Sequence, residues 1–582
     1  MKHFNKLRFI VCMAILTTIL ISCGNFLDVN PKNVLSENEA FKPENLEEFV
    51  TAAYAYLPSQ YFATTQNTWV HGSIRSDDAY KGGDGITDQS QMYELELFVP
   101  VTPNLLWNDG LWFEGYCAIS RCNTALRLLN DVDVTTFPKK EERIGEMRFL
   151  RGYIYTNLKL YWKYIPYADE NVPATSEAYE AIPNRDKSKP NDLYIWEKIL
   201  EDFKAAETKL PEIQEDKGRI NKMAAKAMVA KVLLFMAYEQ NDENQVVNIN
   251  KNRIEEALKY INQITEREGD LVGLCADFAE NFLPDFDNNT KESLYETQYS
   301  IDDGSNAGKT NRGNELNAPW SVGCCDFHKV SFNLMNAFRT DQKTGLPLFD
   351  TFNDVELKGR YKSYFSENTF DPRMGHTVAV PGLPYKYKTD LIFDSTGART
   401  PIVYGYLHSM KEQVDPDCSC IYKPFFTYNS MNAKNIRYAE VLLWKAECLI
   451  QLDREKEALP IINKIRQRAA NSTGRLKNGR LTVNYKIGLY EDGVNCDWTK
   501  EFAMKALQWE NRMETACEGR RFFDLQRWGI LEPTLNAYFA KESRRYSWLQ
   551  KGHFTKGRDE YRPIPQPQIN WAKGNYTQNP GY

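Results

Sequence analysis

Residues 436–451 read IRYAEVLLWKAECLIQ, and this stretch decides the fold class together with the one that follows it. Its apolar side chains recur in steps of three and four, which places one stripe on a helix: Ile436, Ala439, Leu443, Ala446 and Ile450. After a short break at Leu452–Arg454, residues 455–470 carry a second stripe. Two helices joined by so few residues must pack as an antiparallel hairpin. Because Pro460 is awkward inside a helix, we expect the second helix to start nearer Leu459.

The same periodicity continues outward along the chain. Residues 144–163, 192–210 and 221–238 each carry one apolar stripe. Helix pairs of this size resemble tetratricopeptide units, which stack side by side, although long insertions leave no regular repeat. The sequence therefore predicts a mainly α protein: an α-α superhelix of degenerate tetratricopeptide-like helix pairs with long loop insertions.

Three long stretches lack helical periodicity. Residues 64–104 and 286–330 are rich in Gly, Asn, Asp and Ser, and residues 366–435 are rich in Pro, Gly and Tyr. Long structured loops on a helical scaffold usually carry the binding surface, so we expect the ligand site there. We expect one compact unit, divided into a leader (1–22), an N-terminal helical region (23–270, with a binding loop at 64–104) and a C-terminal region (271–582, loop-rich at 286–435, helical at 436–530, with a tail at 531–582).

The charge of the chain excludes one class of partner. The 582 residues hold 72 Lys+Arg and 78 Asp+Glu, a formal net charge of −6. No basic field for nucleic acid is present, so we expect no nucleic-acid partner. Aromatic residues are abundant, with 33 Tyr, 30 Phe and 12 Trp. Most should lie in the core, and a surplus of Tyr and Trp can supply flat faces for ligands.

The first residues resemble an export signal. Lys2, Lys6 and Arg8 precede an apolar stretch that is too short to span a bilayer. The junction Leu20-Ile21-Ser22-Cys23 resembles a bacterial lipobox, in which the cysteine becomes the lipidated first residue of the mature protein. The alternatives are an ordinary signal peptide or a lone apolar anchor. We expect a lipoprotein signal peptide at 1–22 and lipidation of Cys23, which would tether the body to a membrane surface.

The other cysteines do not form a disulfide framework. Cys324-Cys325 and Cys418-Ser-Cys420 lie in predicted loops, where a disulfide would fit an exported protein. No C-x-x-C occurs and no histidine lies at zinc spacing from these cysteines. Four loop aspartates leave calcium open, but their spacing is not that of an EF-hand: Asp285, Asp287, Asp302 and Asp303. We expect no metal and no cofactor.

Several segments, in the right order, resemble one family. They are CGNFLDVNP (23–31), MRFLRGYIYTNLKLY (147–161), IRYAEVLLWKAEC (436–448), INKIRQRA (462–469), WENRMETACEGRRFFDLQRWG (509–529) and YRPIPQPQINWAKGNYTQNPGY (561–582). Together they resemble the SusD/RagB-type lipoproteins of Bacteroidetes. The chain departs from the family pattern at Trp162, where a small residue is usual, and at Asn511, where Arg or Lys is usual.

The resemblance implies a non-catalytic nutrient receptor. Such a protein would be lipid-anchored in the outer membrane and exposed at the cell surface. It would capture an oligosaccharide, or in some members a peptide, and deliver it to a TonB-dependent, SusC-like transporter.

The residues of segment 509–529 also indicate a structural role, independently of the resemblance. It carries seven charges in the sixteen residues from Arg512 to Arg527, at spacings of three and four that allow side-chain pairs on a helix. We interpret it as a structural charge network. Gly519 interrupts the helical pattern and predicts a bend or a close contact.

Two loop segments are the candidate ligand site. Segment 66–84, QNTWVHGSIRSDDAYKGGD, crowds aromatic and charged residues on a Gly-rich loop. The resemblance implies ligand contacts there, which we assign to Trp69, Arg75, Asp78 and Tyr80. Segment 295–328 adds Tyr295 and Trp320 in polar, turn-rich sequence, along with Tyr299 and Asn317. Aromatic faces can cover sugar rings while polar groups meet the hydroxyls. For each residue the alternative is an aromatic or polar group that packs under its own loop.

Other functions remain open on the residues alone. No H-E-x-x-H, G-x-S-x-G or phosphate-binding glycine loop occurs, so we expect no enzyme. An unseen carboxylate pair would make a helical glycoside hydrolase, since such enzymes are also aromatic and acidic. Peptide binding on the same scaffold and a helical-repeat protein that only bridges other proteins are the further alternatives. The aromatic loops favour a glycan over a peptide.

Overall fold

The structure is a computed structural model that describes residues 41–57, 69–99, 101–189, 193–304, 309–357, 361–422 and 427–582. The expected leader at 1–22 and the expected lipidation site Cys23 lie outside these residues, as does part of the expected binding loop at 64–104.

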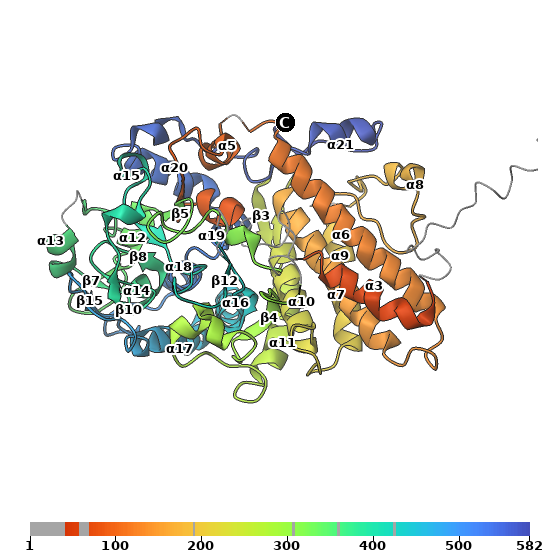
Figure 1. Ribbon diagram of the computed structural model, residues 1–582, viewed down its shortest axis with the longest axis horizontal. Helices are drawn as coiled ribbons and strands as arrows, with labels where there is room; N and C mark the ends of the chain where they lie inside the picture. Colours follow the sequence, from red (N-terminus) through yellow and green to blue (C-terminus); the bar gives the residue numbers. More distant parts are fainter. Residues whose placement is uncertain are drawn as a thin grey trace, which may run out of the picture.

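Helices are the main regular secondary structure of the described chain (Figure 1). They are α3 (Leu46–Tyr54), α5 (Ser90–Leu97), α6 (Leu106–Asp131), α7 (Lys140–Tyr161), α8 (Ser176–Glu180), α9 (Leu193–Lys209), α10 (Lys222–Ala237), α11 (Lys251–Thr265), α12 (Phe332–Ala337), α13 (Tyr361–Ser366), α14 (Arg373–Thr377), α15 (Pro401–Tyr404), α16 (Tyr438–Gln451), α17 (Glu455–Asn471), α18 (Lys500–Thr515), α19 (Arg521–Trp528), α20 (Leu531–Glu542) and α21 (Gln566–Trp571). A π-helical turn, η2, covers Trp69–Ile74.

The long helices stack in chain order. α6 packs on α7, α7 on α9, α9 on α10, and α10 on α11, and α11 then meets α16 of the α16–α17 hairpin. Figure 1 shows this row running from the red and orange helices toward the cyan and blue ones. The apolar stripes explain the arrangement, because each helix buries its stripe against the next. The mainly α prediction, with helix pairs arranged as a superhelix, is confirmed.

The second helix of the hairpin starts earlier than predicted. α17 begins at Glu455, not near Leu459, and Pro460 lies inside the helix. Pro460 is the sixth helical residue, so its missing N–H costs one hydrogen bond, to the carbonyl of Lys456, early in the helix. The buried stripe that contains Ala458, Ile462 and Ile465 stabilises the helix despite that loss.

The sheets are small, and several of them join segments that lie far apart in the sequence. In the described residues they pair β1 (Ala79–Gly82) with β5 (Phe327–Val330), β4 (Ser293–Thr297) with β14 (Ala433–Arg437), β2 (Tyr238–Gln240) with β3 (Val246–Ile249), β8 (Val378–Ala379) with β11 (His408–Ser409), β9 (Pro384–Tyr385) with β10 (Lys388–Ile392), β12 (Ile421–Tyr422) with β13 (Tyr428–Asn429), and β7 (Thr369–Phe370) with both β6 (Arg339–Thr340) and β15 (Asn484–Tyr485).

The stretch 64–104 is more ordered than its composition suggests. It contains η2, β1 and α5, so the expectation of a non-helical loop is wrong for its described part. Residues 90–97, SQMYELEL, hold good helix formers, and Met92 and Leu95 are buried.

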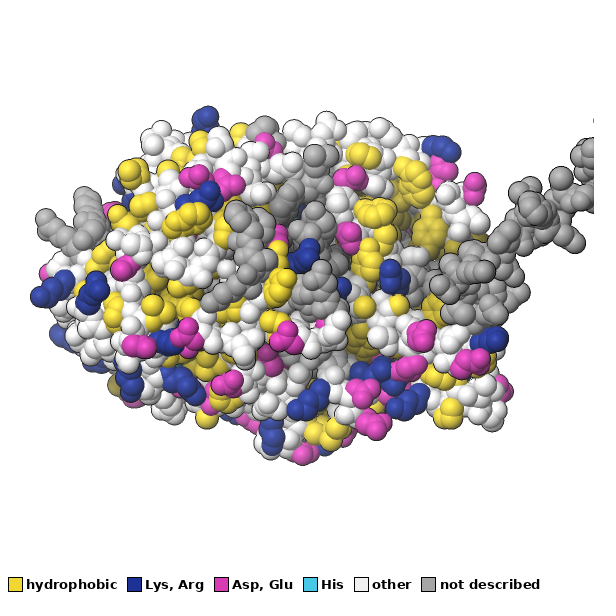
Figure 2. Space-filling model, viewed as in Figure 1, with side chains coloured by type: hydrophobic (Ala, Val, Ile, Leu, Met, Phe, Trp, Pro, Cys, Tyr) yellow, Lys and Arg dark blue, Asp and Glu magenta, His cyan; other side chains and the backbone are white. Residues whose placement is uncertain are grey.

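The main hydrophobic core joins the helical row to the C-terminal tail. It runs from Val50 in α3, through α6 to α11, to Phe522 in α19 and Ile564 in the tail. On the face seen in Figure 2, Lys and Arg side chains are interspersed with Asp and Glu. Among the described residues, no helix is both long and apolar enough to cross a membrane.

Candidate functional site

The structure brings the two predicted loop segments together. β1 and β5 pair antiparallel, with Tyr80 opposite Lys329 and Gly82 opposite Phe327. Gly82 has a positive φ of 84°, and a Cβ there would lie 2.3 Å from the carbonyl oxygen of Asp326. Only glycine allows this approach, so the Gly-rich loop of one segment lies directly against the other.

Trp320 is at the tip of a closed turn in the second segment. Ala318 and Cys325 form a bridge at the base, and Val322 and Gly323 both donate their N–H to the carbonyl of Pro319. Pro319 fixes the entry to the turn. The indole is 48% exposed, which is unusual for so large an apolar side chain. The turn therefore presents a tryptophan to solvent instead of burying it.

Arg399 and two aspartates support this tryptophan. The Arg399 guanidinium lies over the indole, 4.8 Å from the ring centre, and donates to Asp88 (3.2 Å) and Asp84 (3.3 Å) of the Gly-rich loop. Its backbone N–H donates to Asp326 at 2.7 Å. The cation–π contact and the ion pairs hold the ring in place. Arg399 is not predictable from the sequence, because nothing near residue 399 indicates a partner about 80 positions away.

Arg75, Asp78 and Tyr80 are buried, which contradicts the expectation of an exposed loop around them. Arg75 donates to the carbonyl of Asp559, and Asp78 accepts from Arg512 at 3.0 Å. The Tyr80 hydroxyl donates to Glu542 and accepts from the N–H of Phe332 at 3.0 Å. These polar side chains pair with partners far along the chain, so they connect the scaffold.

Trp69 and Tyr295 are also buried. Trp69 stacks on His328 with ring centres 5.3 Å apart, and its indole N–H donates to the carbonyl of Gly313 at 3.2 Å. It lines a polar pocket that Asn311 and Asn314 also line. Tyr295 packs edge-on against Phe149 and Tyr153 of α7. Of the six residues predicted to contact ligand, Trp320 alone is exposed.

Buried charges lie behind the tryptophan turn. The Glu412 carboxylate pairs with His328 and accepts from the Ser409 hydroxyl at 2.7 Å. Burial alone would raise the pKa of Glu412, but His328 and these hydrogen bonds hold it at about 2. Burial raises the pKa of Asp326 although Lys329 pairs with it at 2.7 Å. Buried ion pairs and hydrogen bonds therefore hold the inner side of the turn in place.

The four loop cysteines, for which a disulfide was left open, form two. Cys324 is bonded to Cys325 at the base of the tryptophan turn, and Cys418 is bonded to Cys420. Six other described cysteines are free: Cys117, Cys122, Cys275, Cys448, Cys496 and Cys517. Among the described residues, no group of three or more His, Cys, Asp or Glu side chains could hold a metal ion.

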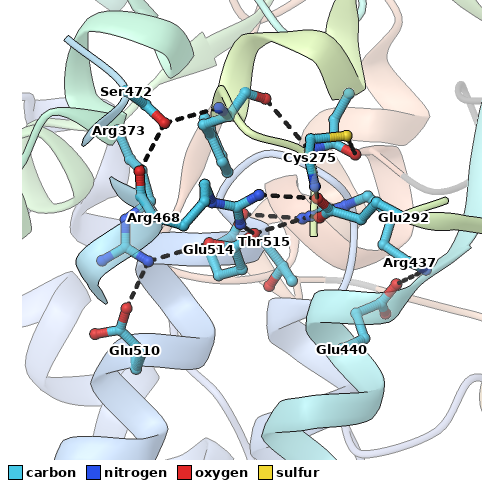
Figure 3. Close-up of polar contacts among 12 residues, drawn as sticks. Cys275, Glu292, Arg373, Arg437, Glu440, Arg468, Ser472, Glu510, Glu514 and Thr515 are labelled. Carbon is cyan, nitrogen blue, oxygen red and sulfur yellow. Dashed lines mark hydrogen bonds and ion pairs between the residues drawn. The ribbon is translucent and has the colours of Figure 1, made fainter. Parts of the chain in front are cut away.

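The charge-rich segment takes part in a buried network (Figure 3). Of the pairs that its spacing allows, Asp524–Arg527 forms at 3.1 Å, and the other partners come from distant parts of the chain. Glu514 of α18 accepts from Arg437 at 2.9 Å and pairs with Arg373 at 3.1 Å and with Arg468. Burial alone would raise the pKa of Glu514, but these three cations hold it well below its usual range. Glu292, which precedes β4, joins Arg437 and Arg468 in the same network. The network fastens β4, α14, α16, α17 and α18 to one another.

Gly519 lies between α18 and α19 with a positive φ of 73°. A Cβ added at Gly72 of η2 would lie 1.9 Å from the carbonyl oxygen of Gly519. Both a bend and a close contact occur at this position, which confirms the prediction. Gly519 therefore marks the point where the N-terminal segment rests on the last helices.

The sequence matches two family models along almost its full length. Residues 291–582 match the model described as "SusD family". Residues 25–234 match the model described as "Starch-binding associating with outer membrane". The chain belongs to the SusD family.

Members of the SusD family resemble the chain in sequence and in fold. "SusD-like protein P2" of Formosa agariphila is 23% identical over 589 residues and covers 100% of both chains. A SusD superfamily protein from Bacteroides vulgatus has a similar fold, with a TM-score of 0.67, 21% identity and coverage of 93% of this chain and 99% of its own. A "Laminarin binding SusD-like protein" has a TM-score of 0.64, 20% identity and coverage of 93% and 99%. The surface glycan-binding protein A from Bacteroides thetaiotaomicron, in complex with laminarihexaose, has a TM-score of 0.59, 19% identity and coverage of 92% and 99%.

Proposed function

We propose that this protein binds an oligosaccharide at the cell surface without cleaving it and delivers it to a TonB-dependent, SusC-like transporter in the outer membrane. The observation that carries the proposal is Trp320, an exposed indole held at the tip of a braced turn. An aromatic ring fixed in this way can cover the apolar face of a sugar ring at little entropic cost.

The groups around the indole suit a polyhydroxylated ligand. The Arg399 guanidinium and the Asp84 and Asp88 carboxylates lie beside it, and Thr400 donates its hydroxyl to Gly83 and Asp84. Charged and hydroxyl groups of this kind donate to and accept from sugar hydroxyls. The proposal is also supported by the SusD-family relatives whose names record laminarin or laminarihexaose.

The test of glycan binding is a titration of the soluble body with a panel of oligosaccharides, followed by single variants. We expect Trp320→Ala to weaken binding at least about tenfold, because it removes the stacking face. Trp571→Ala is the matched control, since Trp571 is 39% exposed on α21, outside the site. Equal affinities for the two variants would exclude Trp320 from the site. Failure of every glycan to bind, with peptides binding instead, would contradict the proposed ligand class.

Two further measurements test the rest of the proposal. Incubation with the bound glycan should release no reducing ends, and a rise in reducing ends would indicate a glycoside hydrolase. In the native host, Cys23→Ala should move the protein from the membrane fraction to the soluble fraction, because the variant cannot be acylated. The lipidated protein should co-purify with a TonB-dependent transporter.

A further inference from the structure

A second pocket lies outside the tryptophan turn, where five helices meet. The C-terminal end of α7, the second half of α10, the start of α16, the end of α18 and the first turns of α19 surround it. Its walls include the rings of Tyr161, Phe235, Trp444 and Phe523. The side-chain amides of Asn157 and Asn511 also line it. Aromatic walls with a few amides are typical of a small-molecule site.

One cation in this pocket lacks a partner. Within the described part of the chain, no hydrogen bond or ion pair reaches Nζ of Lys231, a half-buried residue of α10. The neighbouring charges satisfy one another instead: Arg520 pairs with Glu440 at 3.0 Å, and Arg527 pairs with Asp524 at 3.1 Å and also with Glu447. The lining carries three cations and two carboxylates, and Glu447 behind it supplies a third carboxylate. Lys231 is the one of the three cations that lacks a direct partner among the described residues.

The environment of Lys231 penalises its charge. Burial, with further contributions from Arg520 and Arg527, lowers the pKa of Lys231 to about 8, while Glu440 and Asp524 act in the opposite direction. The amine is still an ammonium at neutral pH, and it would gain from an anion that replaced its lost hydration.

We propose that this pocket binds a compact ligand that carries a carboxylate, with Lys231 as the group that recognises the charge. A carboxylate would pair with the ammonium while the aromatic walls cover the body of the ligand. An acidic sugar and the free carboxylate of a peptide share this chemistry. The inference does not depend on the glycan site at Trp320, because the two sites share no residue.

A smaller pocket adjoins this one. It shares Leu160, Phe235 and Arg527 with it and is lined on its other side by Trp196 and Tyr561. Its volume is only about 20 Å³, so the ligand is a compact one.

The experiment compares sodium glucuronate, glucose and N-acetylglycine by calorimetric titration of the full mature protein at pH 6.5. Glucuronate should bind at least about tenfold more tightly than glucose, the neutral sugar of the same ring type. N-acetylglycine separates the two sources: comparable binding assigns the site to any small carboxylate, and weaker binding assigns it to an acidic sugar. Lys231→Met should abolish the preference for glucuronate over glucose, whereas Lys222→Met, on the same helix outside the pocket, should preserve it.

Two more readouts keep the test independent of variant folding. Binding of glucuronate to the unmodified protein should weaken as the pH rises above about 8, where Lys231 loses its proton. Saturating glucuronate should also slow labelling of Lys231 by an amine-reactive reagent, measured by mass spectrometry. Equal binding of glucuronate and glucose, or unchanged labelling of Lys231, would overturn the proposal.

Discussion

Several titratable side chains are buried where their charged form is unfavourable, and His408 is an example. It lies in β11 behind the tryptophan turn, its Nδ1 is 2.7 Å from the carbonyl oxygen of Ser409, and its Nε2 is 3.7 Å from Asp326. Burial and the nearby Lys329 lower the pKa of His408 to about 3, although Glu412 acts against them. The folded protein therefore holds His408 neutral at pH values where an exposed histidine becomes charged.

This pKa predicts a loss of stability in mild acid. The unfolded chain binds a proton at His408 near pH 6.5 and the folded protein only near pH 3, so the free energy of unfolding should fall as the pH drops below about 6.5. Each such histidine contributes up to about 1.4 kcal/mol per pH unit. His408→Asn should reduce the slope of unfolding free energy between pH 6 and 5, measured by guanidinium titration. His553→Asn is the control, because His553 is exposed and should leave the slope unchanged. Identical slopes for wild type and His408→Asn would contradict the assignment.

At the scale of elements, the α16–α17 hairpin is fixed by charges as well as by its apolar stripe. Arg437 directly precedes α16 and donates to Glu292 at 2.8 Å, to Glu514 at 2.9 Å and to Glu518 at 2.8 and 2.9 Å. All of these groups lie in the interior, where an ion without its partner is costly.

Removing the cation should therefore destabilise the protein strongly. Arg437→Met removes a cation that three buried or partly buried carboxylates share, although each of them keeps another cation. We expect a loss of about 3–5 kcal/mol in the free energy of unfolding. Arg454→Met, in the loop of the same hairpin, removes a surface pair with Glu457 and should cause no measurable change. Chemical denaturation of both variants tests the difference, and a loss below about 1 kcal/mol for Arg437→Met would show that the network relaxes around the gap.

The helices were predictable where one stripe of apolar residues marks the face that is buried. Residues 192–210 and 221–238 became α9 and α10 within one or two residues, because burial of one face decides both periodicity and packing. The site was less predictable. The polar residues Arg75 and Asp78 suggested an exposed loop, yet Asp559 and Arg512, more than 430 positions away, draw them into the interior. The periodicity of one sequence holds no information about partners so distant along the chain. For the same reason the contact of Arg399 with Trp320 could not be predicted.

At the scale of the whole molecule, the C-terminal tail closes the helical row. Trp162 donates its indole N–H to the carbonyl of Pro563 at 2.9 Å, and the buried Asn579 accepts from the N–H of Tyr164 at 3.0 Å and donates to the carbonyl of Arg562. The N–H of Arg562 also donates to the carbonyl of Tyr161, the last residue of α7, at 2.9 Å. The tail is thus bonded to the end of α7 and to the residues that follow it.

Asn579 should therefore matter more than its position near the C-terminus suggests. Asn579→Ala leaves a buried N–H and a buried carbonyl without partners, which should cost about 2 kcal/mol. Asn575→Ala removes a hydrogen bond to Glu180 at the surface and should change stability by less than about 0.5 kcal/mol. Thermal unfolding of the two variants tests this, and equal melting temperatures would show that water replaces the lost contacts of Asn579.

The contact between Gly72 and Gly519 has a consequence for biosynthesis. The strand and turn around residues 69–82 bind partners that the ribosome adds more than 400 residues later, including Arg512, Glu542 and Asp559. The nascent N-terminal third cannot complete its interior until nearly the whole polypeptide has been made, and contacts so distant in sequence slow folding. We expect the segment around residues 69–82 to remain without its partners through most of synthesis, whereas the row from α6 to α11, whose neighbours follow one another in the sequence, can pack earlier.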